Sequence, residues 1–292
     1  MGLELVYNVD GKETTTVESF LLAQHFSKKS LVALKHKDGK VLINDKISKL
    51  WEKASPGDVV IVAFGEEELN HKLPPHQGLV RILYEDDYLL VVDKPAGLAV
   101  MPAGIHSTSL ANIIAYYYES IKLKSTIHFV NRLDRGTSGV VIVAKYRHIH
   151  HLMMRQMNSI KRKYYALVEG MLNTEAGIID ASIYRPTRES ILRVVDSLGQ
   201  RAVTEYKIVK KYPNKTLVEC SLKTGRTHQI RVHMQHLGHS VVDDPLYGDT
   251  NEGDHQMLHS YFVNFLHPIT GEEIEIKTAI PERFMKNLKR CD

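Results

Sequence analysis

The chain contains very little cysteine, and this excludes several ways of holding a small protein together. Only Cys220 and Cys291 occur among the 292 residues, and they form no C-x-x-C pair. Two distant cysteines provide neither a disulfide framework nor the clustered thiolates of a structural zinc site. The sequence therefore indicates a reducing compartment, and we expect the protein in the cytoplasm.

Long apolar runs are missing as well. No segment approaches the roughly 20 consecutive apolar residues that a membrane-spanning helix requires. The N-terminus lacks a basic region followed by an apolar one, so neither secretion nor membrane spanning is expected. With 43% hydrophobic and 25% charged residues, the composition is that of an ordinary globular protein.

Motifs for nucleotide, cofactor and metal chemistry are also absent. The chain has no G-x-x-x-x-G-K-[ST] loop, no glycine-rich opening of a dinucleotide fold and no G-x-S-x-G turn. Seven of its 16 histidines cluster within residues 148–151 and 228–239. Neither cluster has the ligand spacing of a zinc site, and the basic neighbours would repel a cation. We therefore expect no metal, no nucleotide and no other cofactor.

The positive charge is small but unevenly distributed. The net charge is +4 and the pI is near 8.8, whereas residues 1–66 carry as many acids as bases. Residues 145–163 and 223–240 contain several lysines and arginines and no acid. Such runs are typical of contact with a phosphate backbone, although a solvated face would look the same. Because both runs lie beside the motifs described below, they favour a nucleic acid as the partner.

The most informative stretch is a polar loop that leads into a buried strand. Residues 131–139 read Asn-Arg-Leu-Asp-Arg-Gly-Thr-Ser-Gly, and an apolar, β-branched run over residues 140–144 follows. Asp134 lies between Arg132 and Arg135, whose charges favour an ionised carboxylate. An aspartate in such a loop is most often a turn residue. A fixed carboxylate without metal-ligand neighbours would also suit nucleophilic or electrostatic catalysis at a sugar carbon.

The string R-L-D-R-x-T-S-G before an apolar strand resembles the central motif of the RluA/RluD family of RNA pseudouridine synthases. Further strings resemble family motifs in the same order: Y-E-D-x-x-L-L-V-V-D-K-P-A-G-L-A-V from Tyr84, K-R-K-Y-Y-A-L-V-E-G at residues 161–170, which resembles the motif K-x-Y-x-A-L-V-x-G, and T-G-R-T-H-Q-I-R-x-H from Thr224. The chain departs from the family at Asn131, usually His, and at Gly136, often an acid. Neither departure affects Asp134.

The resemblance implies an enzyme that isomerises uridine to pseudouridine in structured ribosomal or transfer RNA, as a monomer without cofactors. Asp134 would be the essential carboxylate, Tyr165 would pack against the target base, and Arg226 would pair with Asp134. The expected RNA contacts are Arg132, Arg135, Lys94, Lys163, Leu222, Thr227, His228 and Arg231. The carboxylate could stabilise charge at the sugar, add to the sugar, or remove a proton from it, and the sequence leaves these routes open.

The resemblance also implies an α+β fold with a large mixed, mostly antiparallel sheet and flanking helices. We expect a small N-terminal module over residues 1–66, a linker over 67–78 that contains Pro74-Pro75, and a catalytic domain over 79–292. The module resembles, in divergent form, the RNA-binding module of small-subunit ribosomal protein four. Helices are expected at residues 17–26, 30–36, 109–121, 147–157 and about 227–237, and strands at 39–44, 59–64, 80–84, 88–92, 163–170, 177–183, 202–210 and 216–222.

Two other interpretations stay open. A non-catalytic RNA-binding protein would explain the basic runs but not the retained Asp134, Tyr165 and Arg226. A glycosylase that releases free base would use similar carboxylate chemistry. The product formed from RNA distinguishes all three possibilities.

Overall fold

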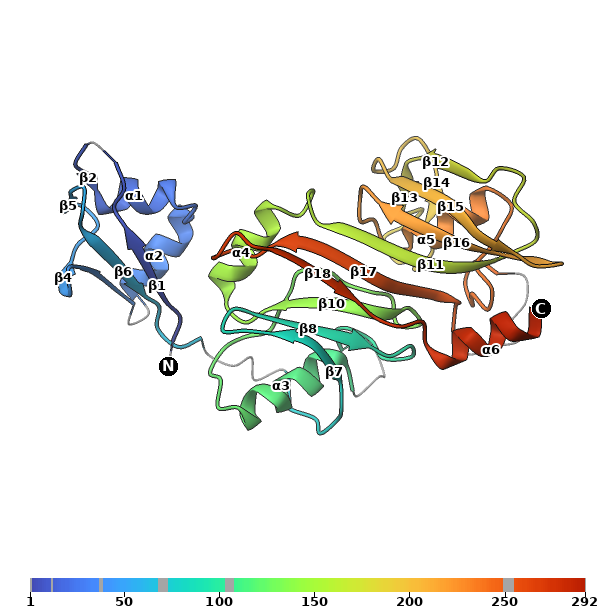
Figure 1. Cartoon of the computed structure of the whole chain (residues 1–292), viewed down its shortest axis with the longest axis horizontal. Helices are drawn as coiled ribbons and strands as arrows, with labels where there is room; N and C mark the ends of the chain where they lie inside the picture. The colour runs from blue at the N-terminus through green and yellow to red at the C-terminus, as the bar shows by residue number, and fades with distance from the viewer. Residues whose placement is uncertain are drawn as a thin grey trace.

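The chain forms two main sheets of very different size (Figure 1). The computed structural model describes residues 2–11, 13–36, 39–67, 73–102, 108–248 and 255–291. The small sheet lies near the N-terminus and the large one forms the centre of the remaining chain. None of the helices in these described ranges is long and apolar enough to cross a membrane.

The N-terminal sheet has four strands in the order β1-β6-β3-β4, covered by two short helices. Its apolar side chains alternate, so that Val60 and Val62 of β6 are buried against Leu21 of α1. Thr16 accepts a hydrogen bond from the backbone N–H of Ser19 at 3.2 Å and so begins α1. The elements are β1 (Glu4–Asn8), β2 (Thr15–Thr16), α1 (Val17–Ala23), α2 (Lys28–His36), β3 (Lys40–Ile43), β4 (Lys46–Ser48), β5 (Lys53–Ala54) and β6 (Val59–Ala63).

The large sheet has ten strands, with β12-β15-β16-β11-β17-β10-β8-β7 as its main path and β18 and β9 paired to β17 and β10. Every pairing is antiparallel except that of β10 with β17. The expected mixed, mostly antiparallel α+β fold is therefore confirmed. The strands are β7 (Arg81–Glu85), β8 (Leu89–Lys94), β9 (His128–Phe129), β10 (Ser138–Ala144), β11 (Lys161–Glu169), β12 (Ala176–Asp180), β15 (Val203–Lys211), β16 (Lys215–Leu222), β17 (Leu258–Leu266) and β18 (Glu273–Lys277).

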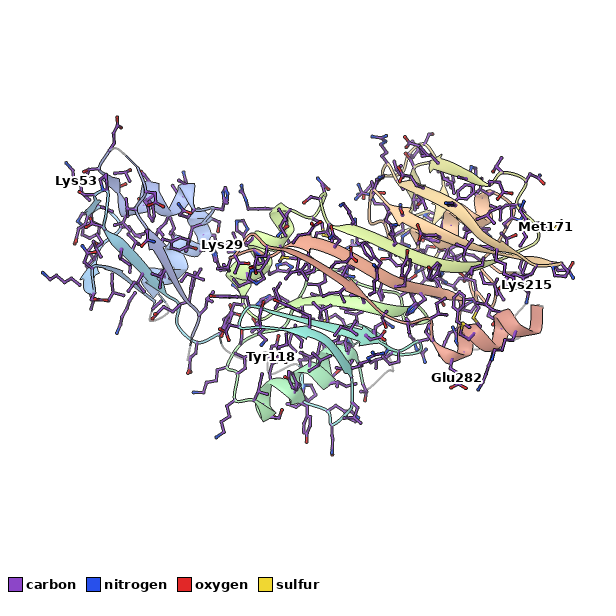
Figure 2. The ribbon with its side chains drawn as sticks, viewed as in Figure 1. Lys29, Lys53, Tyr118, Met171, Lys215 and Glu282 are labelled. Atoms are coloured by element: carbon purple, nitrogen blue, oxygen red, sulfur yellow. The ribbon has the colours of Figure 1, made fainter. Side chains whose placement is uncertain are left out.

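Helices cover both faces of the large sheet, and its central strands are therefore buried on both sides. All seven residues of β10 are buried, and its odd and even positions face different clusters of apolar side chains. Val141 and Val143 pack with α3 (Leu110–Ser120) and, further along the same face, with α5 (Gln229–His236). Figure 2 shows the side chains that fill the space between α3 and the sheet, among them the fully buried Tyr118.

The opposite face is covered by α4 (Arg147–Arg155) and α6 (Glu282–Cys291). Here the N-terminal module meets the large sheet, because its apolar residues and those of α4 and β10 form one continuous cluster. The His148 ring stacks on Phe26 at 4.2 Å and on Phe64 at 5.3 Å between centroids. The module is thus packed against α4 by aromatic contacts.

The segment that joins the two sheets is anchored on the larger one. The carboxylate of Glu67 accepts hydrogen bonds from His128, Thr126 and the backbone N–H of Arg147. Burial favours its neutral form, but these hydrogen bonds outweigh burial and hold the pKa of Glu67 at about 2. Further on, the backbone N–H of His76 donates to Asn112 of α3. The described ends of the expected linker are therefore held in place.

Candidate active site

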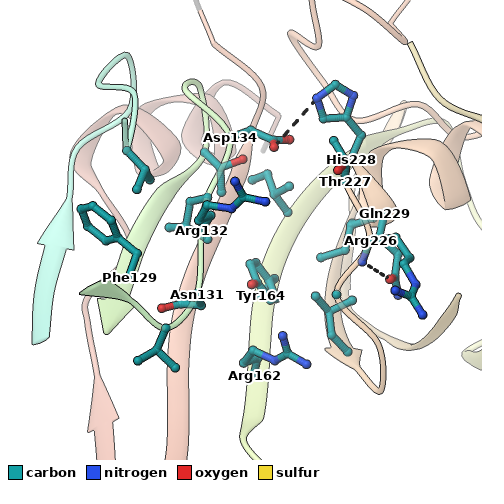
Figure 3. Close-up of a pocket in the computed structure, with 18 of the residues that line it drawn as sticks. Phe129, Asn131, Arg132, Asp134, Arg162, Tyr164, Arg226, Thr227, His228 and Gln229 are labelled. Atoms are coloured by element: carbon teal, nitrogen blue, oxygen red, sulfur yellow. Dashed lines mark hydrogen bonds and ion pairs between the residues drawn. The ribbon is translucent and has the colours of Figure 1, made fainter. Parts of the chain in front are cut away.

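A cavity of about 680 Å³ opens on the face of the large sheet that α3 and α5 cover (Figure 3). Its wall is formed by the loop before β10, by β11 and by the segment that leads into α5. These segments lie far apart in the sequence and meet because β10 and β11 both pair with β17. A cavity of this size is large enough for one small organic ligand.

Hydrogen bonds to its backbone hold the Asp134 loop in place. The Thr137 N–H donates to the Asp134 carbonyl at 3.1 Å, and the Gly97 N–H donates to the Arg135 carbonyl at 2.9 Å. From below, the Nζ of Lys94 donates to the carbonyls of Pro95, Leu98 and Arg135. The aspartate therefore projects from a rigid turn.

Lys94 thus corrects one prediction from sequence. Its side chain is fully buried and its ammonium is surrounded by carbonyls, so it does not lie on a surface that RNA could touch. Burial lowers the pKa of Lys94 to about 7, and the charge of Asp134 opposes that shift. Lys94 joins the loop of residues 95–98 to the Asp134 loop instead.

Asp134 pairs with Arg231, not with Arg226. The Nη1 of Arg231 donates to Oδ2 of Asp134 at 2.8 Å, and its Nε and Nη2 form a bidentate pair with Asp244 at 2.6 and 2.7 Å. Asp244 is completely buried, whereas Asp134 keeps 27% of its side chain exposed. Burial lowers the pKa of Arg231, but Asp244 and Asp134 outweigh it and raise the pKa above the usual range. Asp244 orients the guanidinium, which in turn orients the exposed carboxylate.

Arg226 lies outside this network because α5 begins only at Gln229. The backbone N–H of Arg226 donates to the Gln229 side chain at 2.9 Å, and its exposed guanidinium donates through Nε to the Arg201 carbonyl at 3.1 Å. Arg226 still lines the cavity. The expected pairing of Arg226 with Asp134 is therefore wrong, and Arg231, expected to contact RNA, takes that place.

His228 is the second neighbour of Asp134 (Figure 3). Its Nε2 lies 3.9 Å from Oδ1 of Asp134, and its Nδ1 lies 2.8 Å from the hydroxyl of Tyr247. The backbone of His228 has φ 59°, a left-handed conformation that is uncommon for residues other than glycine. Burial lowers the pKa of His228, and the charge of Asp134 opposes that shift.

The two adjacent tyrosines of β11 point to opposite faces of the sheet. Tyr164 lines the cavity, whereas Tyr165 stacks on Tyr261 at 4.1 Å between ring centroids on the other face. Lys163 also lies on that other face, where it pairs with Glu219 at 3.3 Å. The expected positions of Tyr165 at the target base and of Lys163 at the RNA are wrong, because side chains alternate along a strand. Tyr164, not Tyr165, lines the cavity.

Arg162 is a site residue that the sequence-based prediction missed. It lines the cavity two positions before Tyr164 on the same face of β11 and is only 6% exposed. Its Nε has no hydrogen-bond partner, and in the described part of the chain its guanidinium meets no carboxylate. Gly225 makes room for it, because a Cβ there would lie 2.9 Å from Nη1 of Arg162. The basic run 161–163 thus contains one residue of the cavity.

The other expected RNA contacts also line the cavity. Arg132 is exposed and lines the cavity, together with Leu222 and Thr227. Arg135 also lines it, and its Nε donates to the Gly97 carbonyl at 2.9 Å. Asn131, the departure from the family pattern, bonds through its side chain to the backbone of Val140 and Ile142 in β10. Asn131 therefore braces the strand beside the cavity.

Within the described ranges, no three ligand-type side chains gather in a way that could hold a metal ion. The cavity offers one oriented carboxylate with arginines around it. An oriented carboxylate can stabilise a cationic carbon, add to it or accept a proton.

Comparison with known proteins identifies the family. The model of the RNA pseudouridylate synthase family matches residues 88–236. An uncharacterised RNA pseudouridine synthase of Bacillus subtilis, YjbO, is 37% identical over 278 residues, which is 94% of this chain and 98% of that protein. Ribosomal large subunit pseudouridine synthase D of Neisseria meningitidis serogroup B is 36% identical, over 84% of this chain and 70% of its own. The solved structure of human RNA pseudouridylate synthase domain containing 1 has a TM-score of 0.61 and 25% identity, covering 75% of this chain and 89% of that one.

Proposed function

Because the chain belongs to the RNA pseudouridine synthase family, we propose that it isomerises specific uridines of structured RNA with Asp134 as the essential carboxylate. The observation that carries this proposal is the pair at the cavity wall. Arg231 lies 2.8 Å from Oδ2 of Asp134 and is itself held by the buried Asp244. The carboxylate is thereby oriented and keeps one edge toward the cavity.

The reaction needs only such a group. The N1–C1′ bond of uridine breaks with its electron pair leaving on the uracil, the base turns, and a C5–C1′ bond forms. The proton lost from C5 balances the one gained at N1, so no atom enters or leaves. While the base is detached, the sugar is electron-poor at C1′ and the uracil is electron-rich. Asp134 acts on the sugar in one of three ways: it stabilises the positive charge, adds covalently to the sugar, or removes a proton from it.

Arg162 and Tyr164 are suited to bind the detached, electron-rich uracil. Both line the floor of the cavity from one face of β11, and Arg162 meets no carboxylate in the described part of the chain. A buried guanidinium without a counter-ion favours negative charge, which develops on the uracil as the N1–C1′ bond breaks. The ring of Tyr164 offers the base an aromatic surface. Together they would hold the detached uracil in the cavity.

A structured RNA must release the target base from its stack, at a cost of a few kcal/mol. Arg132 is exposed at the cavity rim, two residues before Asp134. We assign it to fill the space that the flipped base vacates. Arg135, Thr227 and His228 lie nearby on the same rim, where they can position the sugar and its phosphates.

Large-subunit ribosomal RNA is the substrate to test first, because several relatives are named ribosomal large subunit pseudouridine synthase D. We further propose that residues 1–66 form a separate module, since their strands pair only among themselves. A role of this module in RNA binding stays a prediction. Its equal numbers of acids and bases argue for weak binding.

Mapping of pseudouridine in RNA from cells with and without the protein tests the proposal. We expect particular sites to lose the modification and to regain it with the wild-type chain but not with Asp134→Asn. Free uracil and abasic RNA in place of pseudouridine would indicate a glycosylase. An unchanged map would contradict the proposed function.

A further inference from the structure

A second hollow adjoins the cavity and has no part in the reaction described above. Its volume is about 350 Å³, and it shares the lining residues Arg226 and Thr227 with the cavity, so the two lie next to each other. The remaining wall comes from the segment between β12 and β15, which contains the short strands β13 (Ile183–Tyr184) and β14 (Val194–Val195). This segment lies beside α5 (Figure 1).

The charge of the second hollow is entirely positive. Arg185, Arg193 and Arg226 line it, and no acidic residue does. In the described part of the chain, none of the three forms an ion pair with a carboxylate. By contrast, Arg201 close by is paired with Asp180 at 2.7 Å. Three arginines that converge without an acid repel one another, and an anion between them relieves that repulsion.

All three guanidinium groups donate to backbone carbonyls. The Nε of Arg185 donates to the Ser190 carbonyl at 3.0 Å, and the Nε of Arg226 donates to the Arg201 carbonyl at 3.1 Å. These two hydrogen bonds use only Nε. The terminal nitrogens Nη1 and Nη2 of Arg185 and Arg226 take no part in them, and these nitrogens can bind a phosphate. Arg193 differs, because its Nη1 donates to three carbonyls of its own loop and so stabilises the segment.

The second hollow also offers apolar and aromatic surface. Tyr184 is half-buried in its wall, and Leu198 beside it is 77% exposed. An aromatic ring next to arginine forks is the arrangement with which proteins bind a nucleotide of a single strand, stacking on the base and pairing with the phosphate. A free inorganic anion would need the arginines only.

From these observations we propose that the second hollow binds the nucleotide next to the target uridine in the same RNA strand. Arg185 and Arg226 hold its phosphodiester, and Tyr184 and Leu198 contact its base. This inference rests on the proposed function, because it places the target uridine in the adjoining cavity. It adds a phosphate subsite that tethers the strand while the uracil is detached.

The test uses the full chain carrying Asp134→Asn, so that no turnover occurs during binding, and large-subunit ribosomal RNA transcribed in vitro. We expect Arg185→Ala and Arg226→Ala each to raise the Kd about tenfold, the loss typical of a charged hydrogen-bonded contact. Each should also reduce the slope of log K against log salt by about 0.7, as expected for one phosphate contact to a single strand. In the active protein, both variants should raise KM more than they lower kcat.

Arg188→Ala is the matched control, since Arg188 lies in the same segment and is exposed but does not line the hollow. We expect it to leave the Kd and the salt slope unchanged. Oligouridylates of increasing length give a second measurement. The wild-type affinity should rise sharply when the strand reaches the second hollow, and Arg185→Ala should lack that rise.

Two results would overturn the subsite: wild-type affinity in Arg185→Ala, or an equal loss in Arg188→Ala, which would indicate a general positive field. Absence of pseudouridine from the wild-type reaction would instead contradict the proposed function. The comparison of Arg185→Ala with Arg188→Ala would still decide on the subsite, because it depends on binding alone.

Discussion

At the scale of single residues, the position of Asp134 depends on side chains that are distant in sequence. Arg231 and Asp244 follow it by about a hundred residues, yet the three carry one chain of charge-assisted hydrogen bonds. Removal of one member from a buried ion pair costs about 3–5 kcal/mol, because it leaves the other charge uncompensated. Arg231 is therefore expected to serve stability as well as catalysis.

We predict that Arg231→Ala lowers the free energy of unfolding by about 3 kcal/mol and nearly abolishes activity, since it leaves Asp244 unpaired. Arg231→Lys keeps the charge but cannot serve both carboxylates, so it should recover stability better than activity. Urea denaturation and initial rates measure the two effects.

Arg226→Ala is the matched control for this prediction, because its guanidinium is exposed and meets only a carbonyl. It should change stability by less than about 1 kcal/mol. Equal destabilisation by Arg226→Ala and Arg231→Ala would contradict the network.

The sequence led to Asp134 but could not select its partners. Arg226 and Arg231 belong to one motif, and only the start of α5 at Gln229 determines which of them faces inward. Tyr164 and Tyr165 are neighbours, and a shift of one residue in a strand exchanges the faces of the sheet. The distinction between the arginines depends on where the helix starts, whereas the motif contains the one between the tyrosines, because Y-x-A-L-V aligns with Tyr164 and not with Tyr165.

At the scale of elements, the site depends on the one parallel pairing in the large sheet. Periodicity and turn residues predicted β10, β11, α3 and α4 close to their observed bounds. The partner of β10 was not predictable, because β17 is more than a hundred residues away and no local pattern specifies non-local pairing. The pairing includes Gly139 opposite Ser260; Gly139 has φ 115° and would place a Cβ 2.0 Å from the Ser260 carbonyl oxygen.

We predict that Gly139→Ala destabilises the protein by more than about 2 kcal/mol and displaces the Asp134 loop, because backbone strain adds to the steric clash. Gly57→Ala provides the comparison: Gly57 also has a positive φ, 91°, but nothing lies within 4 Å of its missing Cβ. Gly57→Ala should lower the free energy of unfolding by only about 1 kcal/mol. Thermal unfolding of both variants measures the difference, and equal losses would show that the close approach to β17 is unimportant.

At the scale of the whole molecule, His148 of α4 joins the N-terminal module to the rest of the chain through two aromatic contacts. His148 is buried between Phe26 and Phe64, and neither of its ring nitrogens has a hydrogen-bond partner in the described part of the chain. Burial, with a smaller effect from His151, lowers the pKa of His148 to about 4. In the unfolded chain the pKa is near 6.5. The folded state thus binds the proton more weakly, and its stability falls as the pH drops from about 6.5 toward 4.

Replacement of His148 by phenylalanine keeps an aromatic ring at this junction and removes the proton. Between pH 7 and pH 5 we expect the wild-type chain to lose about 2 kcal/mol more stability than His148→Phe. Denaturation at the two pH values provides the measurement. His259, whose pKa burial also lowers to about 4, titrates in both proteins and cancels in the comparison. Parallel losses would mean that His148 is not shielded by the module.

The central claim is that Asp134 carries out the reaction, and one measurement tests it most directly. Purified wild-type and Asp134→Asn proteins are incubated with RNA from cells that lack the protein, and pseudouridine is quantified at the sites that the wild type modifies. The amide keeps the size of the side chain but can neither act as a nucleophile nor carry the negative charge. We predict less than about 1% of wild-type turnover, with folding and RNA binding retained. Substantial pseudouridine formation by the folded Asp134→Asn protein would contradict the account.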